Sequence, residues 1–117
     1  MSLVPEQWEF LKDFAKLIIK AEELGFTVSG GELYRTIEQQ NIYVKDGRST
    51  TYRSKHLRRL AIDLYFFIRE KNGKLKLTWD KNILQPLGDF WESLSPKNSW
   101  GGNWNSFKDV PHFERRA

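Results

Sequence analysis

The sequence predicts an α+β domain in which a small antiparallel sheet is flanked by helices. Apolar residues recur at helical spacing near both ends of the chain, which indicates amphipathic helices. Residues 61–68 are apolar and rich in β-formers, and Asn72-Gly73 then favours a hairpin into a second strand over residues 74–78. The βαβ rhythm of a parallel sheet is missing. With 117 residues, the chain fits one compact domain, so we expect residues 1–117 to form a single domain.

The first helix is predicted to begin near Pro5 and to end before Gly25. Proline is tolerated at the first helical position, where its missing N–H costs no hydrogen bond, and glycine commonly follows a helix. The apolar residues between them are Trp8, Phe10, Leu11, Phe14, Ala15, Leu17, Ile18, Ala21 and Leu24. A short strand is predicted over residues 26–29. It ends at Gly30-Gly31, where the backbone can turn sharply or approach a ligand closely.

A second, shorter helix is predicted over about residues 36–44. Thr36 and Gln39 have the spacing of a capping box, which is typical of a helix start. Residues 48–55 are polar and aperiodic, so we expect an irregular loop that leads into the first histidine.

The third helix is predicted to follow Asp80, which can cap it, although Pro86 in its first turns can shift the start later. Its apolar side contains Ile83, Leu84, Leu87, Phe90, Trp91 and Leu94. Residues 95–108 are rich in Ser, Asn, Gly and Trp and are expected to form an ordered but irregular loop. Residues 110–114 are expected to be extended, because the residue before Pro111 avoids the helical region.

Composition narrows the classes of protein that the chain can belong to. It contains no Cys, which excludes disulfides, thiolate metal ligands and cysteine nucleophiles. No apolar run has the length of a transmembrane helix, and residues 1–9 do not resemble a secretory signal. We therefore expect a soluble product made in the cytoplasm. The net charge of +4 favours an anionic partner such as nucleic acid, anionic lipid or an acidic wall polymer, or else reflects a solvated basic surface.

The two histidines of the chain, His56 and His112, are the strongest functional signal. A catalytic zinc ion takes three protein ligands and leaves a fourth position for water. Asp63 lies in an otherwise apolar strand, where a lone carboxylate is costly unless it is paired or bound to a metal. We therefore predict that His56, Asp63 and His112 bind zinc, with His112 on a strand beside Asp63. Taken singly, each histidine is more often an ordinary one, and Asp63 could instead pair with Arg58 or Arg59.

Asp109 is predicted to be the general base. Val-Pro separates it from His112, and this stiff spacer can hold its carboxylate near the metal without making it a ligand. Such a carboxylate can accept a proton from a zinc-activated water, so hydrolysis is the predicted reaction. Glu114 could orient a ligand as a hydrogen-bond acceptor or simply cap the end of its strand. Trp104, like Trp100, is more often a core or loop anchor than a substrate platform.

Four short motifs follow one another along the chain: Tyr34-Arg35-Thr36-x-Glu38-Gln39, Ser54-x-His56-x6-Asp63, Trp100-Gly101-Gly102-x-Trp104 and Asp109-x-x-His112. Together they resemble the D-alanyl-D-alanine metallopeptidase family, and most of all its phage endolysin branch, the L-alanyl-D-glutamate endopeptidases. The similarity runs from about Phe26 to Glu114. It implies the hedgehog/D-Ala-D-Ala peptidase fold and a zinc peptidase that cuts the peptide stems of bacterial peptidoglycan.

The resemblance also implies roles for single residues. The three predicted ligands fall at the family's zinc positions, and Asp109 falls at its acid/base position. Arg35 matches an arginine that stabilises the substrate carbonyl and its developing oxyanion, and Ser54 matches a serine near the ligands. One departure is Arg59, which stands where the family commonly has Gly. Because Gly often marks special backbone dihedrals or tight packing, the local geometry or the surface charge is expected to differ there.

The expected function is therefore that of a zinc-dependent L-alanyl-D-glutamate endopeptidase, used as an endolysin by a phage or prophage in host lysis. The ligand motif does not name the scissile bond, so a D,D-carboxypeptidase or dipeptidase is the alternative. We expect a monomer, made in the host cytoplasm, that reaches the wall after another protein opens the membrane. A basic module that binds nucleic acid is a distant alternative, because no recognised nucleic-acid motif is present.

A basic cluster surrounds the first histidine and consists of Arg53, Lys55, Arg58 and Arg59. It could attract acidic stem peptides or cell-wall phosphates. It could equally be the solvated edge of the domain.

Overall fold

The computed structural model describes residues 2–48 and 54–117. The elements in chain order are α1 (Val4–Glu23), β1 (Thr27–Gly30), α2 (Ile37–Lys45), the short 3₁₀ helix η1 (Lys55–Arg58), β2 (Ala61–Arg69), β3 (Leu75–Thr78), α3 (Lys81–Leu94), β4 (Asn98–Trp100), the 3₁₀ turn η2 (Gly101–Asn103) and β5 (His112–Arg115). All strand pairs are antiparallel. The predicted α+β class is confirmed. No helix in the described ranges is long and apolar enough to cross a membrane.

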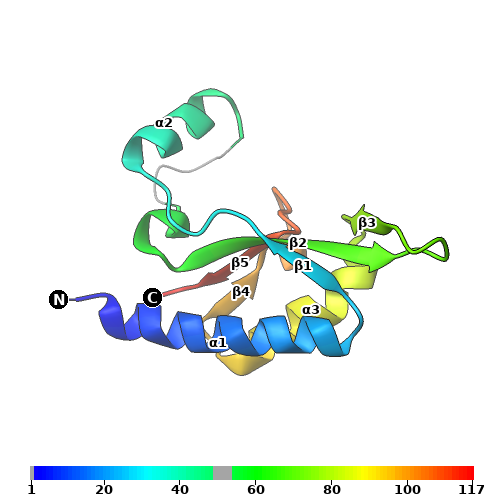
Figure 1. Ribbon diagram of the computed structural model, residues 1–117. Helices are drawn as coiled ribbons and strands as arrows, with labels where there is room; N and C mark the ends of the chain where they lie inside the picture. Colours follow the sequence, from blue (N-terminus) through cyan, green and yellow to red (C-terminus); the bar gives the residue numbers. More distant parts are fainter. Residues whose placement is uncertain (1, 49–53) are drawn as a thin grey trace.

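Strand β2 is the centre of the sheet, as the sequence predicted. Its amino-terminal half pairs with β5, and its carboxyl-terminal half pairs with β1 and β3. Strand β4 lies outside β5, which gives the order β1-β2-β5-β4. Helices α1 and α3 lie on one side of the sheet, whereas α2 stands on the other side, away from the body (Figure 1). The sheet therefore separates α2 from the two long helices.

The hydrophobic core lies between the sheet and the two long helices. Its fully or nearly buried members are Phe10, Leu17, Ala21, Leu60, Ile62, Leu64, Phe66, Leu84, Leu87, Trp91, Trp100 and Phe113. The Trp91 ring packs edge-on against Phe10 and Phe113 with centroid distances of 5.6 and 6.0 Å, a favoured geometry for aromatic pairs. The indole of Trp91 also donates to the Glu114 carbonyl over 3.1 Å, which ties α3 to β5.

Both ends of α1 agree with the sequence prediction, since proline lies at its start and Gly25 follows it with φ of 90°. The expected effect of Pro86 on α3 is wrong, because the helix begins at Lys81 and Pro86 lies inside it. Asp80 caps the start by accepting from the Asn82 N–H over 2.9 Å. That cap and the buried apolar side of the helix hold the first turn in place despite the proline.

The predicted irregular loop over residues 95–108 is only partly correct, because it contains β4 and η2. Strand β4 has no strand-like alternation, and all three of its residues are buried by pairing with β5. Trp100 fits against α3 because Gly88 has no side chain: a Cβ at Gly88 would lie 2.0 Å from the indole. The loop predicted over residues 48–55 falls mostly on residues 49–53, outside the described residues.

Candidate metal centre

Strand pairing places Asp63 and His112 side by side. They are direct partners in the register of β2 and β5, and directly opposite residues of an antiparallel pair project from the same face. His112 Nδ1 lies 3.5 Å from Asp63 Oδ1. The sequence hypothesis that His112 occupies a strand next to Asp63 is therefore confirmed by the register.

His56 reaches the same point from η1. The Ser54 hydroxyl caps this turn by accepting from the His56 backbone N–H over 3.2 Å. The turn ends at Arg59, which has left-handed dihedrals of φ 57° and ψ 36°, a conformation that glycine adopts most readily. Arg59 thus has a conformation that favours glycine, which is the residue that the family pattern commonly has here, and its guanidinium lies over the Tyr34 ring at 4.2 Å.

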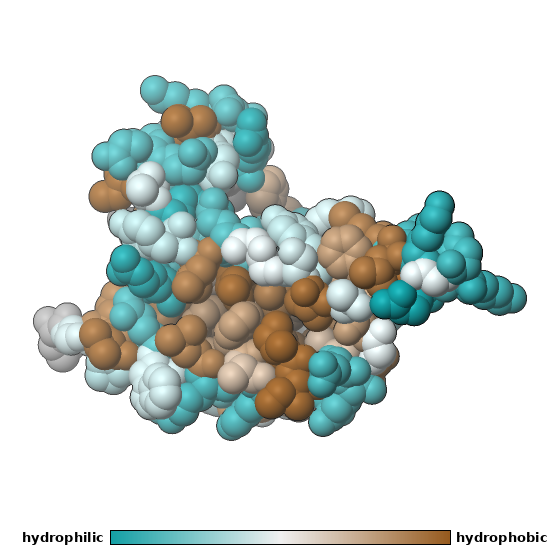
Figure 2. Space-filling view, in the orientation of Figure 1, coloured by the Kyte–Doolittle hydropathy of each residue, from teal (hydrophilic) through white to brown (hydrophobic). Residues whose placement is uncertain are grey.

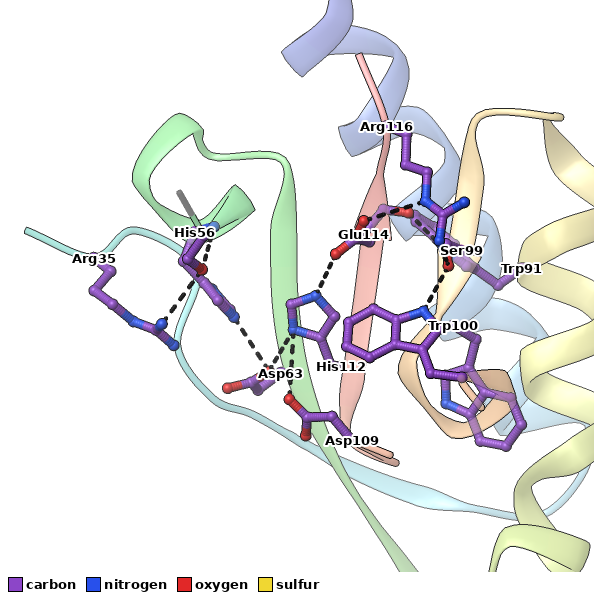
Figure 3. A network of polar contacts seen from close by, with 12 residues as sticks. Arg35, His56, Asp63, Trp91, Ser99, Trp100, Asp109, His112, Glu114 and Arg116 are labelled. Atoms are coloured by element: carbon purple, nitrogen blue, oxygen red, sulfur yellow. Dashed lines mark hydrogen bonds and ion pairs between the residues drawn. The ribbon is translucent and has the colours of Figure 1, made fainter. Parts of the chain in front are cut away.

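One nitrogen or oxygen atom from each of His56, Asp63 and His112 lies within 4.8 Å of the others. His56 Nε2 is 3.4 Å from Asp63 Oδ1. Figure 3 shows the three side chains converging from η1, β2 and β5. The structure therefore brings together the three residues that the sequence analysis selected as metal ligands.

Hydrogen bonds to the outer ring nitrogens orient both imidazoles. His56 Nδ1 lies 3.1 Å from the Leu33 carbonyl oxygen, so it donates there and leaves the Nε2 lone pair facing Asp63. His112 Nε2 lies 2.9 Å from Glu114 Oε1 and leaves Nδ1 facing the centre. Metal-binding histidines commonly donate their second N–H to a carbonyl or carboxylate in this way. Glu114 makes the contact that its predicted orienting role requires.

Two buried atoms at the centre lack hydrogen bonds. His56 Nε2 and Asp63 Oδ1 have no hydrogen-bond partner among the described residues, although buried polar atoms are nearly always satisfied. Neither Arg58 nor Arg59 forms an ion pair with Asp63 within the part of the chain that the structure describes; its contacts are with the two histidines. A cation coordinated by the three side chains would satisfy both atoms, so the residues fit a metal ion.

The electrostatics of the centre favour an ionised carboxylate. Burial alone would raise the pKa of Asp63, but the adjacent His112 and His56 imidazoles outweigh it and hold the pKa at about 2. Burial would lower the pKa of His112, but Asp63 and Glu114 outweigh it and raise the pKa to about 9. A strongly perturbed carboxylate and imidazole in one cavity are typical of a functional site.

Asp109 lies beside the centre without belonging to the three-ligand set. Its Oδ2 is 3.9 Å from His112 Nδ1, and its side chain is 39% exposed. Burial raises the pKa of Asp109 above its usual value. The segment can approach because Gly101 has no side chain: a Cβ there would lie 2.2 Å from the Asp109 carbonyl oxygen. Gly101 of the Trp100-Gly101-Gly102 motif therefore helps to place the predicted base.

Arg35 is held near His56 by a polar network. Its guanidinium donates to Glu32, Gln40 and Ser54, the last over 3.3 Å, and stacks on the Tyr43 ring at 4.7 Å. The Arg35 backbone N–H donates to the His56 carbonyl over 3.1 Å. Sequence reasoning selected Arg35 and Ser54 but missed Glu32 and Tyr43 as their partners, because no local pattern marks residues that meet only after the chain folds.

The candidate ligands and the other predicted site residues line one open cavity of about 480 Å³. Its lining residues are Glu32, Arg35, Tyr43, Arg48, Ser54, Lys55, His56, Asp63, Tyr65, Trp104, Phe107, Asp109, His112 and Glu114. Trp104 lines the cavity and is also anchored, because its Nε1 donates to Ser99 Oγ over 2.9 Å and its ring lies 5.1 Å from that of His112. Every residue predicted to serve the site therefore borders the same space.

Comparison with known proteins identifies the family. Residues 47–115 match the family model described as D-alanyl-D-alanine carboxypeptidase, so the chain belongs to this peptidase family. The L-alanyl-D-glutamate peptidase of Listeria phage A118 is 36% identical over 100 residues, which cover 85% of this chain and 34% of the relative. The chain thus spans about a third of the length of that curated relative.

A solved structure is also similar. The L-Ala D-Glu endopeptidase ChiX of Serratia marcescens matches with a TM-score of 0.66 at 25% identity, covering 89% of this chain and 78% of the ChiX chain. The family model and these two relatives confirm the resemblance stated from the four motifs. They also confirm the fold that the resemblance implied.

Proposed function

We propose that the protein is a zinc-dependent peptidase that cleaves the L-alanyl-D-glutamate bond of peptidoglycan stem peptides. The observation that carries the proposal is the convergence of His56, Asp63 and His112 within 4.8 Å, in a chain of a peptidase family. Asp109 lies beside them in the same cavity. We further propose that the enzyme serves a phage or prophage as an endolysin, since one relative is a phage peptidase.

Zinc is the metal that suits this donor set best. Two imidazole nitrogens and one carboxylate oxygen, with access from an open cavity, form the three-ligand arrangement of catalytic zinc sites. Hard cations such as Mg²⁺ and Ca²⁺ prefer all-oxygen sites. When bound, zinc would supply Lewis acidity that polarises oxygen atoms of the reacting groups.

Asp109 is proposed to move the proton. Its raised pKa brings it closer to neutral pH, where a carboxylate accepts and returns protons more effectively. It would take a proton from the attacking water and deliver it to the leaving amine. The Asp109 carboxylate reaches this position from the segment that leads into β5.

Arg35 is proposed to stabilise the oxyanion that develops on the scissile carbonyl. Its Nε and Nη1 atoms are occupied by Glu32, Gln40 and Ser54, and within the described ranges no residue accepts a hydrogen bond from Nη2. A guanidinium that is fixed in this way stabilises developing charge without reorganising first. Trp104 would contact the substrate from the His112 side.

The bond choice separates this proposal from its alternative. The two named relatives are both L-alanyl-D-glutamate enzymes, which supports the endopeptidase. The description of the family model supports a D,D-carboxypeptidase instead. We also propose that the protein is a monomer that is made in the host cytoplasm and meets the wall after the membrane is opened.

Digestion of purified peptidoglycan tests the proposal directly. The protein would be loaded with Zn²⁺ or treated with a chelator, and the new termini identified by mass spectrometry. A free N-terminal D-Glu released only by the zinc-loaded protein is the expected result. Release of D-Ala would support the carboxypeptidase, and equal release by chelated protein would refute the metal dependence.

A further inference from the structure

We propose that Lys55 forms a carboxylate-binding subsite on the His56 side of the metal centre. This subsite would select stem peptides whose D-Glu residue keeps a free α-carboxylate over those in which that group is amidated. The inference rests on the proposed function, because it concerns how the same cavity chooses its substrate. Lys55 belongs to the basic cluster around His56, for which the sequence alone indicated no definite role.

Among the described residues, three side chains with a permanent positive charge line the cavity: Arg35, Arg48 and Lys55. Arg35 is neutralised by Glu32, and Arg48 lies 3.7 Å from the Asp46 carboxylate. Lys55 forms no ion pair with any residue of the described ranges. Among these three side chains, Lys55 is therefore the one without an ion-pair partner in the described ranges, and it has no part in the proposed oxyanion stabilisation.

The backbone of η1 fixes Lys55 at the edge of the centre. Lys55 follows the cap residue Ser54 and precedes the ligand candidate His56, and its carbonyl accepts from the Leu60 N–H over 3.1 Å. The residue is half-buried. A lysine in this position can hold an anion close to His56 as a compact point charge.

Glu114, which lines the same cavity, does not neutralise Lys55. Glu114 is committed to His112, with 2.9 Å between Oε1 and Nε2. Lys55 and Glu114 both line the cavity, yet the two side chains form no ion pair. Lys55 is thus close enough to influence the cavity but is not paired within it.

The substrate has an anion where Lys55 could bind it. In a stem peptide the leaving nitrogen is attached to the α-carbon of D-Glu, and the chain continues through the γ-carboxyl group. The free α-carboxylate is therefore attached to the same carbon as the scissile nitrogen and must lie near the metal during cleavage. The His112 side of the cavity carries the Trp104 ring, which offers no charge to bind an anion. The α-carboxylate is accordingly assigned to the His56 side.

Two synthetic peptides that differ only in this group test the assignment. One contains N-acetyl-L-Ala-γ-D-Glu-L-Lys, and the other contains D-isoglutamine in place of D-Glu. The zinc-loaded wild type is expected to cleave the carboxylate peptide with a kcat/KM about tenfold higher, as the loss of one charge-assisted contact implies. Lys55→Gln should bring the two values close together, mainly by lowering that of the carboxylate peptide.

Arg58→Gln is the matched control, because Arg58 lies on the same short helix, is exposed and does not line the cavity. It removes the same charge and should leave the preference unchanged, and Lys55→Arg should keep the preference too. If the wild type cleaved the two peptides with similar kcat/KM, the inference would be overturned whether or not any variant folds. The proposed endopeptidase activity would still stand. A Lys55→Gln enzyme that kept the full preference for the carboxylate peptide would overturn the inference as well. If the wild type cleaved neither peptide, both the proposed bond and this inference would be refuted.

Discussion

The candidate metal centre joins two regions that are stabilised in different ways. On one side, Asp63 and His112 lie on paired strands that rest on the hydrophobic core. On the other side, His56 and Arg35 belong to an arm made of residues 31–48 and 54–59, in which Gln40 is the one buried residue of α2. Figure 2 shows the same contrast at the surface, where the region over α2 is largely hydrophilic and large apolar areas cover the body.

The difference indicates how the centre is preorganised. Backbone pairing fixes two of the candidate ligands, because the strands cannot shift without disturbing packed side chains. The third depends on hydrogen bonds among Arg35, Glu32 and Ser54 and on the contact of His56 with the Leu33 carbonyl. A bound cation would therefore connect the arm to the sheet, and we expect metal removal to loosen the arm more than the body.

Loss of a ligand should have the largest effect. His56→Ala and His112→Ala are each expected to lower peptidoglycan hydrolysis by about 10⁴-fold or more, because the Lewis acid is lost with the ligand set. Zinc should also raise the Tm of the wild type but of neither variant, since binding to the native state adds to folding stability. Metal analysis and thermal melts check this. Full zinc occupancy in either variant would contradict the assignment.

The proposed base should have the next largest effect. Asp109→Asn is expected to lower kcat by about 10³-fold, because the amide cannot accept the proton, while zinc binding is retained. Asp89→Asn, an exposed substitution on α3, is the matched control and should be silent. Steady-state kinetics and zinc titration separate the two properties. Retained turnover in Asp109→Asn would show that another group is the base.

Zinc affinity should depend on pH through His112. Its pKa of about 9 means that the imidazole is protonated near neutral pH in the chelated protein, so zinc must displace that proton. The apparent affinity is expected to rise about tenfold per pH unit from about pH 7 to pH 9 and then to level off. Calorimetric titration in buffers of different ionisation enthalpy would count the released proton, and an affinity that does not change with pH would contradict the prediction.

The same shifts predict the stability of the chelated protein, with opposite signs for the two groups. The pKa of His112 is raised from 6.5 to about 9, so its contribution is complete below pH 6.5 and is lost as the pH rises through 9. The pKa of Asp63 is lowered from 3.8 to about 2, so its contribution is present above pH 3.8 and is lost as the pH falls toward 2. Denaturant midpoints measured across this range check both limits.

A pair of structural substitutions compares the body with the arm directly. Gly88→Ala is expected to cost about 1–3 kcal/mol of global stability, because its Cβ would overlap the buried Trp100 ring. Thr36→Ala removes the hydroxyl that accepts from the Gln39 N–H over 3.1 Å at the start of α2. Its cost of about 1 kcal/mol should appear mainly as faster hydrogen exchange in α2, with little change in global stability. Equal global effects would show that the arm unfolds together with the body.

Local patterns in the sequence were sufficient for the elements whose signals are short-range. Helix α1, strand β2 and the cap of α3 each have an apolar period, a β-rich run or a capping residue that acts within a few positions. The donor set was also visible, because two histidines and an otherwise costly carboxylate leave few alternatives in a chain without Cys. These features depend on residue type and spacing alone.

Tertiary structure decided what depends on distant partners. Strand β4 forms by pairing with β5, and its three residues show no alternation of buried and exposed side chains that would have predicted a strand. The choice of Nε2 on His56 and Nδ1 on His112 depends on the Leu33 carbonyl and on Glu114. Glu32 and Tyr43 became partners of Arg35 only when the arm folded. Spacing along the chain says which groups are available, whereas the register of the sheet and the path of the arm determine which atoms face one another.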